Sequence, residues 1–310
     1  MQDDTMIRAL ALGGRARVVA AATTATVERL REIHGTSPTV TAALGRVATG
    51  ALLLAAALEK VTAREPVLTV EIDGGGPAGR LLATASPSGW VRATVAHPRA
   101  TAPARDDGKL DVAAVVGTAG RLVVTRDPGI GEPYRGVVPL VSGEIAKDLA
   151  TYLSESEQTP AAVALGVHVL PEARVSHAGG YLVELLPGVS DAEAEALAAR
   201  VESLGAVTPR MREGEGPEAW IGTLFPDGYE ILDTVPVRFQ CGCSRDRVER
   251  ALKLLGAAEV RELLESSRTE PVTLTCEFCR TPYTVPREDL VRLLAEIEEE
   301  TGRPADAPAN

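Results

Sequence analysis

Short apolar runs, broken by glycine and proline, fill the first 186 residues of the chain. Runs rich in Val, Leu and Thr are typical of strands, and the Gly and Pro residues between them are typical of turns. Residues 6–12 and 15–22 flank Gly13 and Gly14 as the two strands of a hairpin do. The same pattern predicts strands at residues 67–72, 80–84, 90–95, 121–125, 134–140, 163–169 and 181–186.

Segments with the spacing of a helix are fewer. Thr24 is placed to cap a helix that ends at Gly35, and Ser142 is placed to cap a helix over residues 143–156. The apolar run 47–58 is too short to cross a bilayer, which takes about 20 residues, so we expect a buried core helix there. Because strand-turn-strand runs outnumber strand-helix alternations, the pattern predicts an α+β fold in which helices pack on a mainly antiparallel sheet.

The character of the sequence changes after Pro187. Ser190 and Glu193 form a capping box that opens a helix to about Leu204, and a stretch rich in Gly and Pro follows. We therefore predict four parts: an N-terminal α+β core (1–186), a helical linker (187–233), a small C-terminal module (234–297) and a flexible polar tail (298–310).

Composition and charge narrow the class of protein. The chain has 45% hydrophobic but only 3% aromatic residues, so its core must be built from Ala, Val, Leu and Ile. A net charge of -11 opposes general binding to nucleic acid or to an anionic membrane, and we expect neither as a partner. The N-terminus lacks the basic and apolar regions of a secretory signal, so we expect a cytoplasmic protein whose thiols are kept reduced.

The strongest chemical signal is a set of four cysteines near the C-terminus. A C-x-C pair and a C-x-x-C pair can place four thiolates around one zinc ion in a tetrahedron. Such a site has no open coordination position and binds the metal structurally, and no histidine after His177 offers a mixed ligand set. The predicted zinc ligands are Cys241, Cys243, Cys276 and Cys279.

The spacing alone leaves two interpretations of this site open. The two sulfurs of C-x-C are close neighbours that would form a strained, easily reduced disulfide, which makes a redox switch possible beside a purely structural finger. A thiol oxidoreductase is less favoured, because its C-x-x-C begins a helix whereas residues 280–286 are typical of a turn and a strand. Ser244 is placed to cap a helix beside the first pair; Arg245, Arg247 and Arg280 either offset the thiolate charge or are solvated surface residues.

Other candidate motifs give no active site. Gly74, Gly76 and Gly79 match a dinucleotide-binding spacing, but residues 80–85 are too few for the required helix, so a hairpin turn is the better interpretation. The four histidines stand outside any catalytic motif and are expected to be structural, and we predict no enzyme: His34, His97, His168 and His177.

Beyond the cysteines, several short motifs together resemble one family over essentially the whole chain. The chain is similar to the heat-shock protein 33 family of bacterial redox-regulated chaperones. The motifs that carry this resemblance are Pro133-Tyr134-Arg135-Gly136, Ser142-Gly143-Glu144-Ile145-Ala146, Ser156-Glu157-Gln158-Thr159-Pro160, Ala178-Gly179-Gly180 and Leu224-Phe225-Pro226.

The resemblance implies a reduced, zinc-bound form that is largely inactive. It implies that hypochlorous acid, or peroxide with heat, joins Cys241 to Cys243 and Cys276 to Cys279, releases zinc and unfolds module and linker. The product would be an ATP-independent holdase that binds unfolding proteins and forms a homodimer. Candidate client-binding residues, for each of which ordinary linker packing is the slightly favoured alternative, are Trp220, Ile221, Leu224 and Phe225.

Three hypotheses therefore make different predictions. A redox-switched holdase suppresses client aggregation only after oxidation. A constitutive zinc-finger adaptor binds a folded partner only while zinc is present. A thiol-disulfide enzyme turns over a disulfide substrate, and it is the least favoured of the three.

Overall fold

A computed structural model of the chain describes residues 3–59, 63–267 and 271–302. The chain divides into two compact units, Met1–Gln240 and Cys241–Asn310. Helices and mainly antiparallel sheets make up the first unit, so the predicted α+β class is confirmed.

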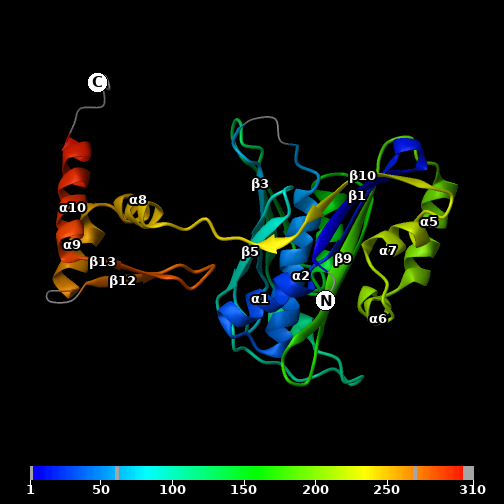
Figure 1. Ribbon diagram of the computed structural model, residues 1–310, viewed down its shortest axis with the longest axis horizontal. Helices are drawn as coiled ribbons and strands as arrows, with labels where there is room; N and C mark the ends of the chain where they lie inside the picture. The colour runs from blue at the N-terminus through cyan, green and yellow to red at the C-terminus, as the bar shows by residue number, and fades with distance from the viewer. Residues whose placement is uncertain (1–2, 60–62, 268–270, 303–310) are drawn as a thin grey trace. The chain divides into compact units, whose positions relative to one another are not determined.

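A five-stranded antiparallel sheet forms one layer of the first unit (Figure 1). Its first hairpin is the predicted one, with Thr5 opposite Ala22 and Ala11 opposite Ala16. Gly13 turns this hairpin at a φ of 63°, in the left-handed region that favours glycine. In spatial order the strands are β10 (Tyr229–Pro236), β1 (Thr5–Ala11), β2 (Ala16–Ala22), β9 (Val175–Leu185) and β8 (Ala161–Val169).

A six-stranded sheet forms the second layer. The Gly-rich stretch is the turn of its hairpin between β3 and β4, as predicted, and its glycines allow a close backbone approach. A Cβ atom on Gly74 would lie 2.4 Å from the carbonyl oxygen of Val116. In spatial order the strands are β11 (Arg238–Phe239), β5 (Trp90–Val95), β4 (Leu81–Ala85), β3 (Val67–Asp73), β6 (Arg121–Asp127) and β7 (Tyr134–Pro139), and only β11 runs parallel to its neighbour.

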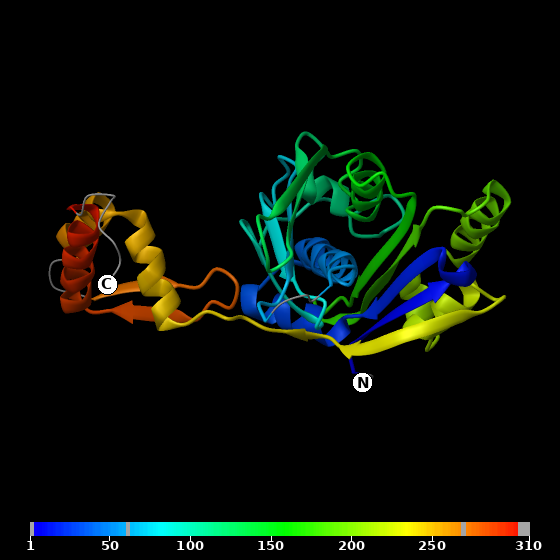
Figure 2. The same ribbon diagram turned by 90° about the horizontal axis from the view of Figure 1, so that it is seen from above.

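Helix α2 (Pro38–Ala55) lies between the two sheets and contacts strands of both (Figure 2). Ser37 caps it by accepting a hydrogen bond from the backbone N–H of Val40 at 3.3 Å. Within the described residues it is the one helix long and apolar enough to cross a membrane, yet 89% of it is buried inside the fold. The predicted core helix is therefore confirmed. Shorter helices around it are α1 (Thr24–His34), α3 (Val112–Val116) and α4 (Ala146–Glu155).

Two predicted helix caps are wrong, because an aspartate performs each function. The Asp4 carboxylate accepts hydrogen bonds from the backbone N–H groups at the start of α1, whereas the Thr24 hydroxyl accepts one from Ala178 on β9. The Asp148 carboxylate, fully buried, accepts from the N–H groups of Ser142 and Ile145, and α4 begins only after Ile145. The sequence pattern indicated neither arrangement, because Asp4 is distant from α1 in the sequence and the loop before α4 contains Ile145 at a positive φ.

The predicted linker segment folds into helices α5 (Asp191–Leu204), α6 (Val207–Arg212) and α7 (Pro217–Leu224). The capping box of α5 is confirmed, since the Ser190 hydroxyl accepts from the N–H of Glu193 at 3.3 Å. These helices cover the face of the five-stranded sheet opposite to α2 (Figure 1). The apolar cluster between helices and sheet includes Trp220, Ile221, Leu224 and Phe225, which are all buried.

The boundary predicted between residues 233 and 234 falls within β10. That strand and β11 pair with strands of the first unit, so residues 234–240 belong to the first unit and the second begins at Cys241. The separate roles predicted for the core, the linker, the module and the tail stay predictions.

The second unit combines helices with one hairpin. Its helices are α8 (Arg245–Leu255), α9 (Ala257–Ser266) and α10 (Arg287–Gly302), and its hairpin pairs β12 (Val272–Thr275) with β13 (Pro282–Val285). Leu252, Val260 and Leu293 are among the side chains of its own apolar core. Helix α10 includes residues 298–302 of the predicted tail, and residues 303–310 lie outside the described part of the chain.

Candidate metal centre

Two local structures present the four cysteines. Cys241 and Cys243 lie just before α8, whose first turn is capped by the Ser244 hydroxyl accepting from the N–H of Arg247 at 3.3 Å. The cap was predicted, and it places Cys243 near the positive end of the helix dipole, which favours a thiolate.

The second cysteine pair lies in the turn of the β12–β13 hairpin. The backbone N–H of Cys276 donates to the carbonyl of Thr281 at 3.0 Å, and the N–H of Arg280 donates to the carbonyl of Cys276 at 2.9 Å. Arg280 has a φ of 59°, so this tight turn depends on a left-handed residue directly after Cys279. The hairpin thus fixes the backbone of the C-x-x-C pair.

The sulfur atoms of all four cysteines lie within 4.8 Å of one another. Cys241 Sγ is 3.7 Å from Cys276 Sγ, and Cys243 Sγ is 3.3 Å from Cys279 Sγ. A tetrahedral zinc site with Zn–S bonds of about 2.3 Å separates its sulfurs by about 3.8 Å. The four groups are free thiols and half-buried, and their spacing fits one zinc ion. Both short sulfur–sulfur distances join a cysteine of the C-x-C pair to one of the C-x-x-C pair. They therefore do not test the disulfides expected within each pair.

Hydrogen bonds and burial make the four thiols unequal. Burial raises the pKa of Cys241 to about 12 and also raises the pKa of Cys243. Burial opposes ionisation of Cys279 too, but hydrogen bonding to the side chain and backbone of Thr281 outweighs it and lowers its pKa to about 6. Hydrogen bonding therefore favours the thiolate form of Cys279, whereas burial favours the protonated form of Cys241 and Cys243.

The sequence did not point to two residues beside the sulfurs. The hydroxyl of Tyr283 donates to Cys243 Sγ at 3.0 Å, and Thr281 Oγ1 lies within hydrogen-bond distance of Cys279 Sγ, at 3.2 Å. The bond to the sulfur raises the pKa of Tyr283 to about 12. The available signal was a pair of polar residues two and four positions after Cys279, one in the turn and one on β13.

Of the three arginines considered as counter-charges, Arg245 has other partners. It contacts the carboxylates of Glu249 and Asp289, and donates to the carbonyl of Thr284 at 2.9 Å. Arg247 lies against the first ligand pair, because a Cβ atom on Gly242 would lie 2.9 Å from its Nη1.

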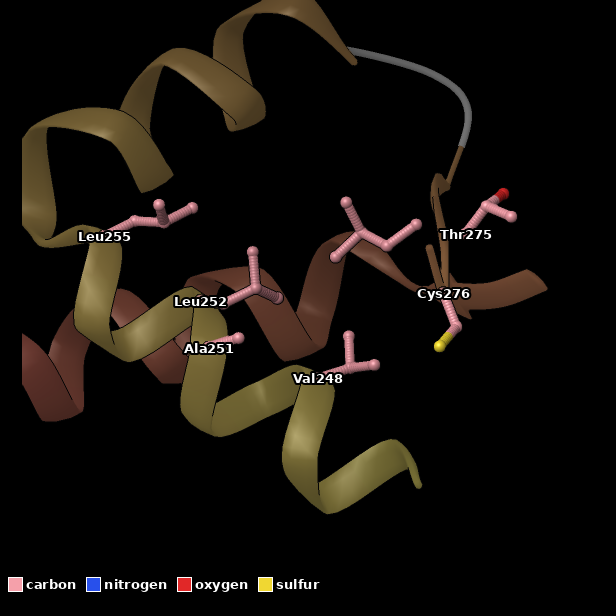
Figure 3. Close-up of a pocket in the computed structure, with 7 residues that line it drawn as sticks. Val248, Ala251, Leu252, Leu255, Thr275 and Cys276 are labelled. Carbon is pink, nitrogen blue, oxygen red and sulfur yellow. The ribbon is translucent and has the colours of Figure 1, made fainter. Parts of the chain in front are cut away.

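An apolar groove of about 230 Å³ borders the site on one side. Helix α8 lines it with apolar side chains, and Thr275 and Cys276 close its other wall, with the Cys276 sulfur on the side of Val248 (Figure 3). The other lining residues are Ala251, Leu252, Leu255 and Leu274.

Comparison with known proteins identifies the family. A family model described as Hsp33 protein matches residues 4–286. The chain belongs to the Hsp33 family. A "33 kDa chaperonin" from Staphylococcus aureus is 36% identical over 298 residues, covering 96% of this chain and 100% of the relative. One from Bacillus subtilis is 39% identical over 288 residues, covering 93% and 97%.

A solved structure supports the Hsp33 assignment at the level of the fold. The crystal structure of a 33 kDa chaperonin, named as a heat shock protein 33 homolog, from Thermotoga maritima matches with a TM-score of 0.84 and 29% identity. The match covers 96% of this chain and 100% of that one. The predicted family is confirmed, and membership of this Hsp33 family supports a chaperone function.

Proposed function

We propose that this Hsp33-family chain is a redox-regulated, ATP-independent holdase that is inactive while reduced and zinc-bound. The observation that carries the proposal is the cluster of four cysteine sulfurs within 4.8 Å of one another in a chain of a chaperone family. The proposed ligands are Cys241, Cys243, Cys276 and Cys279. No enzymatic activity is part of the proposal.

Four thiolates leave a bound zinc ion no open position, so the ion supplies a structural cross-link. The chain's residues position the ligands: the arm before α8 carries one pair, and the β12–β13 hairpin carries the other. Tyr283 and Thr281 hold the sulfurs of Cys243 and Cys279 in place through their hydrogen bonds. The core of the second unit is small, so its fold depends on this cross-link.

The proposed switch is a two-electron oxidation of each cysteine pair. Two thiols and one hypochlorous acid give one disulfide, chloride, a proton and water, so Cys241 joins Cys243 and Cys276 joins Cys279 in two such steps. Sulfurs joined in disulfides no longer bind a metal, and the second unit loses its cross-link.

Loss of the second unit's fold then releases the linker helices. Four apolar side chains that are buried against the five-stranded sheet in the reduced, zinc-bound form then become available to unfolding client proteins. They are Trp220, Ile221, Leu224 and Phe225. We propose that the oxidised chain acts in the cytoplasm and forms a homodimer.

One preparation tests this function. Zinc content, free thiols and suppression of the aggregation of a chemically unfolded protein are measured before and after hypochlorous acid. Zinc and thiols should disappear as suppression appears, and Cys243→Ser should have lost zinc beforehand. Loss of zinc and thiols with no gain of suppression would leave a structural zinc finger and refute the switch.

A further inference from the structure

Strand β10 is an edge strand of the five-stranded sheet. It pairs antiparallel with β1, with Thr5 opposite Pro236 and Ala11 opposite Tyr229, and it has β1 as its one neighbour in the sheet. None of its residues is fully buried, and Leu232 is 53% exposed at a bulge in the ladder. Main-chain hydrogen bonds therefore contribute a large share of the free energy that holds β10, beside the partly buried side chains of Tyr229 and Val235, which pack against the apolar clusters.

One ion pair adds to these hydrogen bonds. Arg8 on β1 donates through Nε to Asp233 Oδ1 at 2.7 Å and through Nη2 to the second carboxylate oxygen. The hydrogen bonds from Arg8 lower the pKa of Asp233. Both side chains are about one-third exposed, so the pair contributes modestly.

Strand β1, in contrast, belongs to the core. Met6 and Ala9 are fully buried on opposite faces of the sheet. Ile7, Ala9 and Ala11 face the linker helices and lie in the same apolar cluster as Trp220. Release of α5–α7 and β10 would leave β1 in place, with an open edge and an apolar face next to it.

The position of β10 in the chain links it to the switch. It lies between α7, in the proposed linker, and Cys241, where the cysteine unit begins. After oxidation, the linker helices before β10 and the cysteine unit after it would both be released. Besides its own pairing with β1, β10 would then be supported by the two-residue strand β11 that follows it.

We propose that β10 is an autoinhibitory strand, and that the edge of β1 it covers is a client-binding site of the oxidised protein. An extended apolar segment of an unfolding protein pairs with Thr5–Ala11 as β10 does in the reduced protein. This inference rests on the proposed function and adds a client-binding surface to the side chains named there.

An extended client is the occupant that this edge selects. Main-chain hydrogen bonds are independent of sequence, so one edge accepts unrelated proteins, and β10 itself shows that a strand fits there. Folded proteins already pair their strands and offer no free segment, so the edge discriminates by folding state. The seven residues of β1 set the length of the segment.

A synthetic peptide with the sequence of residues 229–236 tests the site on the full-length chain. The labelled peptide should bind the oxidised protein at least ten-fold more tightly than the reduced one, and should inhibit its suppression of aggregation. A peptide methylated at alternate backbone nitrogens should do neither, because it cannot complete a ladder. Suppression of aggregation that the peptide leaves unchanged would overturn the inference but not the proposed function. Oxidised protein that binds the peptide yet suppresses no aggregation would refute the proposed function alone.

A charge reversal gives a second test. Asp233→Lys places a cation beside Arg8 and should let the reduced, zinc-loaded protein bind the labelled peptide at least five-fold more tightly. Glu230→Lys makes the same charge change at an exposed position of the same strand and should have no effect. Circular dichroism and zinc content verify that both variants are folded. Equal peptide binding by the two folded variants would show that β10 does not block access to the edge of β1.

Discussion

The hydroxyl of Tyr283 isolates the contribution of a single hydrogen bond to the cysteine cluster. It donates to Cys243 Sγ at 3.0 Å, and Tyr283→Phe removes this bond while keeping the ring. Groups that orient metal ligands typically change metal affinity about 10- to 100-fold, so we expect about a ten-fold loss of zinc affinity. Competition with a chromophoric chelator measures it. Tyr134→Phe, which removes a hydroxyl in the first unit, is the control, and equal affinity in both variants would contradict the role.

The residues of the cysteine cluster were only partly predictable. Spacing alone indicated the ligands, because a chelating pair must be close in sequence to place two sulfurs on one ion. Tyr283 and Thr281 act through geometry set by the hairpin, and a hydrogen bond to sulfur leaves no periodic trace in the sequence. The low pKa of Cys279 follows from the same turn and was equally hidden.

Helix α7 should be sensitive to a single change at Trp220. Trp220 is fully buried against the five-stranded sheet, and Trp→Ala in a core typically destabilises by about 3–5 kcal/mol. We expect Trp220→Ala to loosen the linker helices of the reduced protein without loss of zinc. Trypsin cleavage after Arg212 should accelerate, and Glu218→Gln, at an exposed position of the same helix, should cleave like wild type. Unchanged cleavage would mean that Trp220 does not hold the linker.

Attachment of α5 to the sheet should depend on pH. Arg15, in the turn just before β2, binds the Glu193 carboxylate at 2.6 Å, and this contact lowers the pKa of Glu193 to about 2. A carboxyl whose pKa is depressed in the folded state contributes stability above its usual value of 4.5, and loses it as the pH falls from about 4.5 to about 2. Hydrogen exchange of α5 should therefore accelerate in this range more in wild type than in Glu193→Gln. Identical pH profiles would exclude the ion pair as the cause.

Strands with alternating apolar and polar side chains, and helices capped by a residue next to them in the sequence, were predicted well. The strands between residues 67 and 140 and helix α5 illustrate this. Strand β10 was not, because an edge strand with exposed side chains and a bulge lacks a clear period of two. The caps from Asp4 and Asp148 were missed since the first depends on tertiary structure and the second on a residue at positive φ.

At the scale of the whole molecule, removal of zinc should unfold one unit and spare the other. The second unit has a small core, and structural zinc contributes on the order of 10–16 kcal/mol in finger peptides. The first unit is built around α2 and two sheets. Chelation of the reduced protein should expose the amides of α8–α10 to hydrogen exchange while those of β3–β6 stay protected, and added zinc should reverse the change. Protection retained in α8–α10 would show that the second unit folds without metal.

The hairpin that carries Cys276 and Cys279 has a consequence for the return to the resting state. This hairpin closes over a few residues, a process that takes microseconds in isolated hairpins. The pair before α8 is separated from the hairpin by α8 and α9, so a much longer loop must close before it reaches the ion. After reduction we expect the hairpin to capture the ion first and the distant pair to follow. The recovery would then pass through a half-ligated species, and its lifetime would set how long the chaperone stays available after the oxidant has gone.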